Sequence, residues 1–447
     1  MRIPVLALLN SQEPLQESAA ASVEGRRATI PLEATRTPPQ LQLDPNFAAV
    51  AVGSGRPSQM GLRSLAPNTS QRFAVRGFVE IDDPSNIPAE ANGQPLFADP
   101  AIAPFLTCIG SQPVGGVAQV RTKLNVAALA ARGLDGSGVA VAIMDTGINL
   151  PYLKNKLGTA PLLDAANSWT PAGSSTAPGA HPVDHGTMCA FDTLIAAPRA
   201  TLLDYPILST NAPGGAVVGS TLAVAVQAFA QLIAFWGVAF AAGGAPRYKA
   251  LVVSNSWGIY HPSWDFPAGH PGRYIDNPNH PFQGLVSVLA RAGADILFAA
   301  GNCGADCPDS KCQNRTTETI MGANASPDVL TLAGCDTQDA RVGYSAQGPS
   351  IAGMFQKKPD ITAYTHFLGS EAFGANSPDS GTSAACPVAA GCVAAIRSKL
   401  APRVVPPSNL FAQLMATARQ TGGAAGWNGD LGHGIIDPDT AAQSAGV

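Results

Sequence analysis

The stretch that decides the fold is Val139–Ala140–Val141–Ala142–Ile143–Met144–Asp145–Thr146–Gly147. An unbroken apolar run follows the glycine-rich turn Gly133–Gly138 and ends in a carboxylate. Such a short run between turn residues predicts a strand buried on both faces, as in a parallel sheet. Functional residues of parallel sheets lie beyond the carboxyl ends of the strands, so Asp145 stands where a site is expected.

Two more short motifs follow along the chain. Asp184–His185–Gly186–Thr187 comes first, and Gly381–Thr382–Ser383–Ala384–Ala385–Cys386–Pro387 lies much further on. Alone, each motif occurs by chance, as a turn carboxylate, a helix-start histidine or an N-cap serine. Together they give the order Asp, His, Ser, which is one of three chain orders of the acyl-transfer triad.

These three residue types divide the chemistry between them. Ser383 is a weak nucleophile until a base takes its hydroxyl proton, and His185 can take that proton and later give it to a leaving amine. Asp145 would hold the imidazole in the required tautomer and stabilise its cation. The motifs therefore predict a triad of Asp145, His185 and Ser383.

On these motifs the chain resembles the subtilisin-like serine proteases (subtilases), over roughly residues 118–447. The resemblance implies a serine endopeptidase. Phe298–Ala299–Ala300–Gly301–Asn302 resembles the oxyanion motif of the family, in which the asparagine side chain donates to the developing oxyanion. The second donor would be the Ser383 backbone N–H, at the start of a helix through Val388–Ile396 whose dipole favours negative charge.

Val252–Val253–Ser254–Asn255–Ser256–Trp257–Gly258 resembles the segment along which subtilases bind an extended peptide as an added strand. Trp257 either lines a pocket or belongs to the core. Small residues on the opposite wall, with no acid placed to meet a cation, favour uncharged substrate side chains. The resemblance implies these substrate-binding residues: Ser254, Asn255, Ser256, Trp257, Gly258, Ala299, Ala300 and Gly301.

The chain departs from the family pattern after His185. Met188–Cys189–Ala190 replaces the usual second histidine and Val-Ala-Gly. The segment up to Ala197–Pro198 is short and leaves no room for the calcium-binding loop of secreted relatives. We therefore expect no metal in the active site and no cofactor, and the case for an extracellular enzyme is weakened.

Apolar strands alternate with helical stretches after Val120, which predicts an α/β fold: a three-layer, doubly wound parallel sheet. The expected strands are 139–144, 200–208, 251–255, 296–300 and 329–333, and the expected helices are 124–131, 187–196, 221–242 and 284–292. We assign residues 118–447 to this subtilisin-like catalytic domain. Residues 1–117 are expected to form a small N-terminal accessory or propeptide-like region.

The N-terminal region differs from the rest in composition, because the first lysine of the chain is Lys123. Strands are expected at Phe47–Val52 and Arg72–Ile81, followed by a loop. The apolar start Met1–Leu9 lacks a nearby small-residue cleavage site, so we expect a cytoplasmic protein. Subtilases commonly carry an N-terminal propeptide that plugs the active site. By position, this region either restrains access to the cleft or is a structural extension.

The composition of the chain limits the classes of partner that it is expected to bind. Hydrophobic residues make up 46% of the chain, charged residues 13%, and the net charge is −4 without long runs of one sign. This predicts a globular protein with a polypeptide substrate and no nucleic acid or membrane partner. Thr221–Gly244 is apolar enough to suggest a membrane span, but its place between two expected strands favours a crossover helix.

The 8 cysteines fall into two groups. Those in apolar helical contexts near the motifs are expected to fill space, namely Cys189, Cys386 and Cys392. The cluster of Cys303, Cys307 and Cys312, with Cys335 further on, fits no common zinc spacing closely. Reduced loop thiols, disulfides and a metal site all stay open for this cluster.

The sequence thus predicts a serine endopeptidase that forms an acyl-enzyme. Two alternatives share the fold. A peptide transamidase or macrocyclase would pass the acyl group to an amine instead of water. An occluded subtilase scaffold would act as a binding module, with residues 1–117 closing the site.

Overall fold

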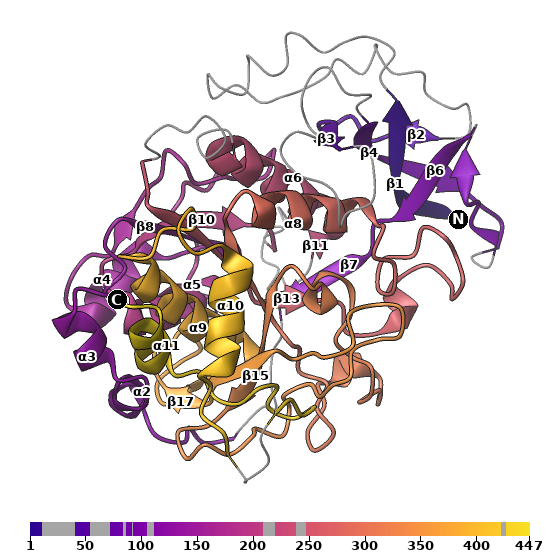
Figure 1. Ribbon diagram of the computed structural model, residues 1–447. Coiled ribbons are helices and arrows are strands. Elements are labelled where there is room, and N and C mark those ends of the chain that lie inside the picture. Colours follow the sequence, from indigo (N-terminus) through magenta and orange to yellow (C-terminus); the bar gives the residue numbers. More distant parts are fainter. Residues whose placement is uncertain are drawn as a thin grey trace. The chain divides into compact units, whose positions relative to one another are not determined.

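The computed structural model describes residues 1–10, 41–53, 72–83, 86–91, 93–104, 111–208, 220–237, 247–421 and 426–447 (Figure 1). The chain divides into two compact units. Unit 1 comprises Met1–Ala101, Thr221–Ala245 and Pro262–Ala292, and unit 2 comprises Ile102–Ser220, Pro246–His261 and Gly293–Val447. The boundary expected at residue 117 stays a prediction.

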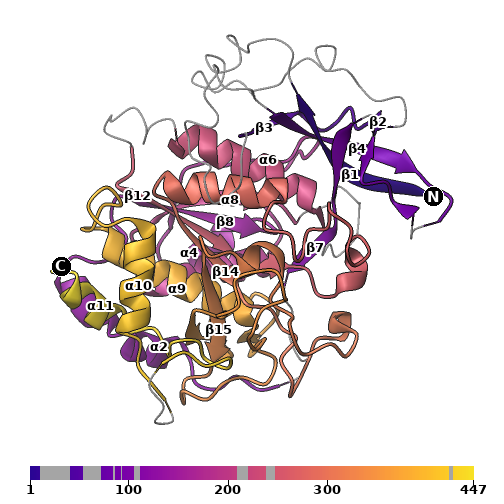
Figure 2. The same ribbon diagram turned by 45° about the vertical axis from the view of Figure 1, so that its right-hand side comes forward.

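Unit 2 is built on a parallel sheet in the order β16-β15-β14-β12-β8-β10-β9. Figure 2 shows β8, β12, β14 and β15 side by side. The strands are β8 (Val139–Asp145), β9 (Leu162–Leu163), β10 (Thr201–Pro206), β12 (Ala250–Asn255), β14 (Asp295–Ala299), β15 (Leu330–Cys335) and β16 (Ile361–Tyr364). Every residue of β8, β12, β14, β15 and β16 is buried, which explains why these strands read as unbroken apolar runs.

Helices flank this sheet. They are α2 (Val117–Lys123), α3 (Val126–Ala131), α4 (Leu150–Leu157), α5 (His185–Ala196), α9 (Thr382–Arg397), α10 (Pro407–Ala416) and α11 (Pro438–Ser444). Helices α5 and α9, which carry the expected histidine and serine, pack closely. A Cβ added at Gly391 of α9 would lie 2.2 Å from the Thr193 backbone oxygen of α5. The predicted doubly wound α/β class is confirmed.

The short elements of unit 2 lie around the sheet. They are β13 (Trp257–Gly258), β17 (Phe367–Leu368), β18 (Pro378–Asp379) and the 3₁₀ turns η7 (Ser310–Cys312) and η8 (Gly322–Ala325). Strands β7 (Ala101–Pro104) and β11 (Ser220–Thr221) span the points where the chain passes between units.

Unit 1 holds an antiparallel sheet in the order β2-β4-β1-β6-β5, with β3 also paired to β4. Its strands are β1 (Arg2–Asn10), β2 (Gln42–Leu43), β3 (Val50–Val52), β4 (Arg72–Glu80), β5 (Glu90–Ala91) and β6 (Gln94–Ala98). The apolar stretch Met1–Leu9 forms the central strand β1, with Ala7 opposite both Val75 and Leu96. The prediction of a loop after Ile81 is wrong in part, because strands β5 and β6 form there.

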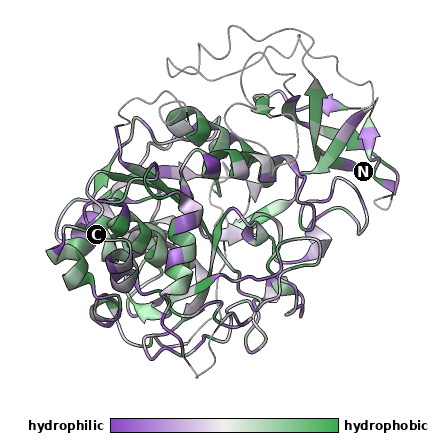
Figure 3. Ribbon diagram, viewed as in Figure 1, coloured by the Kyte–Doolittle hydropathy of each residue, from purple (hydrophilic) through white to green (hydrophobic). Residues whose placement is uncertain are grey.

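Unit 1 also holds α6 (Leu222–Leu232), the π-helix η5 (Ile233–Gly237), the 3₁₀ turn η6 (Pro262–Trp264) and α8 (Pro281–Arg291). The rings of Phe229 and Phe282 meet edge to face 4.9 Å apart, so α6 packs on α8. Within the described ranges, no helix is long and apolar enough to cross a membrane. The hydropathy colouring of Figure 3 places most apolar residues in strands and helices and most polar residues in loops.

Candidate active site

The structure brings Asp145 and His185 into direct contact. Nδ1 of His185 lies 2.8 Å and 3.0 Å from the two Asp145 carboxylate oxygens. Asp145 ends β8, His185 begins α5, and Ser383 is the second residue of α9. The three side chains have exposed fractions of 1%, 2% and 0%. The expected triad residues therefore lie at the carboxyl edge of the sheet, in a buried setting.

The glycines of the two motifs are explained by close backbone contact. The Gly186 backbone N–H donates to Thr146 Oγ1 at 2.8 Å, which joins the motif around His185 to the motif around Asp145. A Cβ at Gly186 would lie 2.5 Å from the Gly147 oxygen, so a side chain there would separate the motifs. The Thr146 N–H also donates to Asp145 Oδ1 at 2.7 Å and fixes the carboxylate.

Ser383 is tied to the segment expected to bind substrate. Its hydroxyl donates to the Ser256 backbone oxygen at 3.2 Å, while the Ser256 hydroxyl donates to the Ser383 backbone oxygen at 3.0 Å. Gly381 precedes the helix with a φ of 82°, a conformation that favours glycine. The start of α9 is thus held against the end of β12.

Asn302 is oriented by the residue beside Ser383. Its Oδ1 accepts from the Thr382 backbone N–H at 2.9 Å and from Thr382 Oγ1 at 3.1 Å. Because the oxygen of the amide is used in this way, the NH₂ end points away from Thr382. The Asn302 amide is thereby held next to Ser383, the position in which an oxyanion donor is expected.

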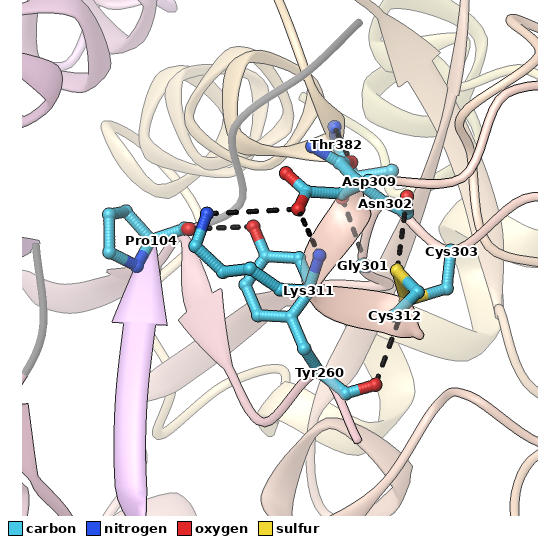
Figure 4. Close-up of a disulfide and its surroundings, with 9 residues drawn as sticks. All are labelled: Pro104, Tyr260, Gly301, Asn302, Cys303, Asp309, Lys311, Cys312 and Thr382. Carbon is cyan, nitrogen blue, oxygen red and sulfur yellow. Dashed lines mark hydrogen bonds and ion pairs between the residues drawn. A yellow bond between two sulfur atoms is a disulfide. The ribbon is translucent and has the colours of Figure 1, made fainter. Parts of the chain in front are cut away.

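A disulfide loop holds the backbone of Asn302 (Figure 4). Cys303 and Cys312 are joined, and the Asp309 N–H within their loop donates to the Asn302 oxygen at 2.9 Å. Cys307 is also disulfide-bonded, and Cys335 is a buried free thiol. Of the alternatives for this cluster, the structure shows disulfides. Disulfides are typical of oxidising compartments, and the expected cytoplasmic location stays a prediction.

Cys189 does more than fill space. Its thiol lies 3.5 Å from Asp145 Oδ2 and 3.5 Å from the Ser383 backbone oxygen. Burial raises the pKa of the Cys189 thiol well above its usual range, so the group is a donor and not a thiolate. The thiol therefore adds a weak hydrogen bond behind the carboxylate.

The residues expected to bind substrate divide into two sets. The Ser254 hydroxyl meets Cys386 Sγ at 3.8 Å, and Asn255 Nδ2 donates to the Leu297 oxygen at 3.0 Å, so both side chains are engaged inside the fold. Trp257 is fully buried, and its ring meets that of Phe298 edge to face at 5.3 Å. Of the two alternatives for Trp257, the structure shows a core residue.

The backbone of β13 remains the expected binding edge. Trp257 pairs with Pro104 and Gly258 pairs with Ala103, both of β7, in antiparallel register. Across from β13, the stretch Ala299–Gly301 leads from β14 to Asn302.

Asn324 is a site residue that sequence reasoning missed. Its Nδ2 donates to the Trp257 oxygen at 3.0 Å and to the Ala299 oxygen at 2.9 Å. The side chain is 3% exposed, and its own backbone oxygen accepts from Thr331 Oγ1 at 2.7 Å. Asn324 thus joins the two segments expected to wall the substrate pocket. No motif marks it, because it lies in the irregular turn η8.

A second buried histidine–aspartate pair lies behind the site. Nε2 of His181 is 3.8 Å from Asp204 Oδ2, which accepts from the Gly179 N–H at 2.8 Å and the Ile148 N–H at 3.2 Å. Burial raises the pKa of Asp204 to about 7 and lowers the pKa of His181. A Cβ at Gly147 would lie 2.2 Å from the His181 ring, so this ring supports the turn after Asp145.

A parallel sheet with Asp, His and Ser at its carboxyl edge is the arrangement of a serine-type hydrolase. The chain belongs to the subtilase family, since residues 136–434 match the model described as "Subtilase family".

The chain is similar to several known proteases. It is 27% identical over 252 residues to "Serine protease AprX" of Bacillus subtilis (strain 168), covering 52% of this chain and 47% of that protein. It is 30% identical over 168 residues to the human "Membrane-bound transcription factor site-1 protease", covering 36% of this chain and 15% of that protein. The chain thus spans less than half the length of these relatives.

Among solved structures, the chain is similar to MycP1 with the N-terminal propeptide removed. That match has 21% sequence identity and a TM-score of 0.47, and it covers 72% of this chain and 96% of that chain.

Proposed function

We propose that this chain is a serine endopeptidase that cleaves peptide bonds through Asp145, His185 and Ser383. The observation that carries the proposal is the 2.8 Å contact between His185 Nδ1 and Asp145 Oδ1. A neutral histidine bonded in this way through Nδ1 presents Nε2 as a base. Membership of the subtilase family supports the role of Ser383 as the nucleophile.

The reaction follows from the positions of these groups. Ser383 Oγ attacks the carbonyl carbon of the scissile bond while its proton passes to His185 Nε2. Asn302 Nδ2 and the Ser383 N–H stabilise the oxyanion. The intermediate collapses, the C–N bond breaks, and the imidazolium protonates the leaving amine. A water then attacks the acyl-enzyme ester, which releases the acid and restores Ser383.

The substrate is a polypeptide bound in extended form along β13. Main-chain hydrogen bonds to Trp257 and Gly258 would supply affinity without selecting a sequence. Selection would come from the pocket beside Ala299–Gly301, whose residues are small and uncharged. We therefore propose apolar or uncharged side chains before the scissile bond.

The first test replaces the nucleophile. Ser383→Ala should abolish peptide cleavage and labelling by an active-site phosphonate, because no other group supplies the attacking oxygen. Ser408→Ala, at an exposed serine of α10, is the matched control and should keep both activities. Wild-type turnover in Ser383→Ala would show that the triad assignment is wrong.

We also propose that residues 1–117 restrain access to the site. Ala103 and Pro104 take up backbone pairing on Gly258 and Trp257, the edge that an extended substrate would use. The Tyr260 hydroxyl donates to the Pro104 oxygen at 2.8 Å and adds to this attachment. Ser383 and Asn302 are completely buried, so a substrate needs some segment to move before it can reach them.

This restraint is tested by cutting the chain near Gly110–Gly116. The cut protein should gain activity, and addition of the separated N-terminal segment should remove the gain. The same cut in Ser383→Ala should give no activity, which excludes a contaminating protease. A folded catalytic domain that is no faster than the full chain would mean that residues 1–117 are a structural extension.

A further inference from the structure

An aromatic side chain stands beside the catalytic histidine on a surface loop. Phe373 lies between β17 and β18, and its ring centroid is 6.4 Å from that of His185. Phe373 is 46% exposed, whereas His185 is 2% exposed. A single exposed aromatic residue is ordinary in itself. The position of Phe373 beside the His185 imidazole indicates a functional role.

The start of the loop is anchored on both sides. The Tyr152 hydroxyl of α4 donates to the Ser370 oxygen at 2.8 Å. Ser370 in turn donates from its N–H and its hydroxyl to the buried carboxylate of Asp379, at 2.5 Å and 2.6 Å. The chain leading to Phe373 is therefore fixed before it reaches the surface.

The tip of the loop is anchored as well. Lys156 forms an ion pair with Glu371, and the Asn376 N–H donates to Glu371 Oε1 at 2.8 Å. These contacts enclose Phe373 on either side in the sequence. Its ring is consequently presented in a defined place, as a recognition residue needs to be.

The direction of the substrate identifies what meets this ring. In the proposed function, the part of the peptide before the scissile bond lies on β13 and beside Ala299–Gly301. His185 donates its proton to the amine that leaves, so that amine must approach the imidazole. Phe373 reaches the same imidazole from the β17–β18 loop, which contributes nothing to the acyl side described above.

We propose that Phe373 is a specificity-determining residue for the leaving side of the substrate, where it contacts an apolar side chain just after the scissile bond. This inference rests on the proposed protease activity and deepens it. Contact between such a side chain and the half-exposed ring removes apolar surface of both from water. Two aromatic rings, or an aromatic and an aliphatic side chain, would gain most from this contact.

The same position would serve an incoming amine. A peptide amine can attack the acyl-enzyme carbonyl, giving up a proton to His185. The ester bond to Ser383 then breaks, and the proton returns to Ser383 Oγ. Because this step is the reverse of acylation, an amine component with an apolar first residue should be captured better than one that begins with glycine.

The experiment compares two peptides that share one acyl part. The first has Leu-Leu after the scissile bond and the second has Gly-Gly there. Both are assayed with the full chain and with the chain cut near Gly110–Gly116. Phe373→Ala should lower the ratio of kcat/KM for Leu-Leu to kcat/KM for Gly-Gly by about tenfold, the factor expected when burial of an apolar side chain is lost.

Two variants give the comparison its control. Phe373→Leu keeps an apolar group and should retain most of the ratio. Phe355→Ala removes a phenylalanine of nearly equal exposure, 45%, from a different loop and should leave the ratio unchanged.

The outcomes separate this inference from the proposed function. An unchanged ratio in Phe373→Ala, or equal losses on both peptides, would overturn the role of Phe373 while leaving the protease intact. If the unaltered chain cleaves neither peptide, cut or uncut, the proposed function fails and this inference with it.

Discussion

Two buried histidine–aspartate pairs lie among the described residues of unit 2, and they differ in one decisive respect. His185 and Asp145 approach to 2.8 Å and 3.0 Å through both carboxylate oxygens, whereas His181 and Asp204 stay 3.8 Å apart. Asp204 Oδ2, the oxygen nearer to His181, accepts hydrogen bonds from two backbone N–H groups. Residue type and burial are therefore not enough to make a catalytic pair. Of these two pairs, the direct contact of His185 with Asp145 is the one that fits the proposed triad.

Two buried asparagines repeat this contrast. Asn302 is oriented by Thr382, next to Ser383, through its amide Oδ1. Asn324 uses its amide Nδ2 on the carbonyls of Trp257 and Ala299. The first asparagine is suited to bind a charge that develops, and the second to hold two strands at a fixed separation.

The largest difference should come from changing each aspartate to asparagine. Asp145→Asn should lower kcat by about ten-thousandfold, because the imidazole is then held in the wrong tautomer. Asp204→Asn should lower kcat by less than about tenfold, since Asp204 mainly accepts from backbone N–H groups. Steady-state kinetics on one peptide would measure both. Equal losses would erase the distinction between the two pairs.

The first asparagine should give the next largest effect. Asn302→Ala should reduce kcat by roughly a hundred- to a thousandfold with little change in KM, the typical result of losing one oxyanion donor. Steady-state kinetics with separate kcat and KM values would check this. A variant that binds substrate poorly but keeps its turnover would mean that Asn302 positions substrate instead.

Replacement of Asn324, the second asparagine, should change substrate selectivity more than turnover. Asn324→Ala leaves two buried carbonyls without their donor, so β13 and β14 lose the link across the pocket. We expect kcat/KM to fall by about tenfold for the preferred side chain before the scissile bond, and by less for poor ones. Peptide-library profiling would measure this flattening.

Asn409→Ala, at an exposed asparagine of α10, is the control and should keep the wild-type profile. A uniform loss across the library in Asn324→Ala would point to a structural role alone.

The sequence predicted most of the parallel sheet, and the motifs around Asp145 and His185 that it singled out lie in contact in the fold. Buried parallel strands such as β8 and β12 have unbroken apolar runs, and these can be read without knowing their neighbours. The triad motifs could be read for a related reason. Gly186 and Gly147 are required by contact between the two motifs, so this contact leaves a local trace in the sequence.

What the sequence did not predict depends on pairing across long distances. The central strand β1 was not expected as a strand, because its partners β4 and β6 lie far along the chain. Asn324 and Asp204 gave no signal for the same reason. Each is an ordinary polar residue until the fold buries it beside particular carbonyls or N–H groups. Trp257 stayed undecided in the sequence, because a pocket wall and a core position both accept a large aromatic side chain.

A third buried pair consists of two aspartates and gives the smallest predicted effect. Asp192 of α5 and Asp379 of β18 interact, and no donor group of another described residue reaches the Asp192 oxygens. Asp379 already accepts twice from Ser370, so the shared proton belongs to Asp192. Burial, with the charge of Asp379 nearby, raises the pKa of Asp192 well above its usual range, and burial raises the pKa of Asp379 to about 6.

These shifts make stability depend on pH in a defined direction. An aspartate in the unfolded chain loses its proton near pH 4, whereas Asp192 keeps its proton in the fold. Above about pH 4 Asp192 therefore binds more protons in the folded state than in the unfolded chain, and its contribution to the free energy of unfolding falls as the pH rises. Asp192→Asn supplies a permanent donor to Asp379, so its stability relative to wild type should grow with pH, by at most about 1.4 kcal/mol per pH unit. Urea unfolding at pH 5, 6, 7 and 8 would measure this slope. Asp192→Ala should lose the same pH dependence but be less stable overall, because it leaves Asp379 without that donor. A difference between Asp192→Asn and wild type that stays constant with pH would mean that no proton is shared by the pair.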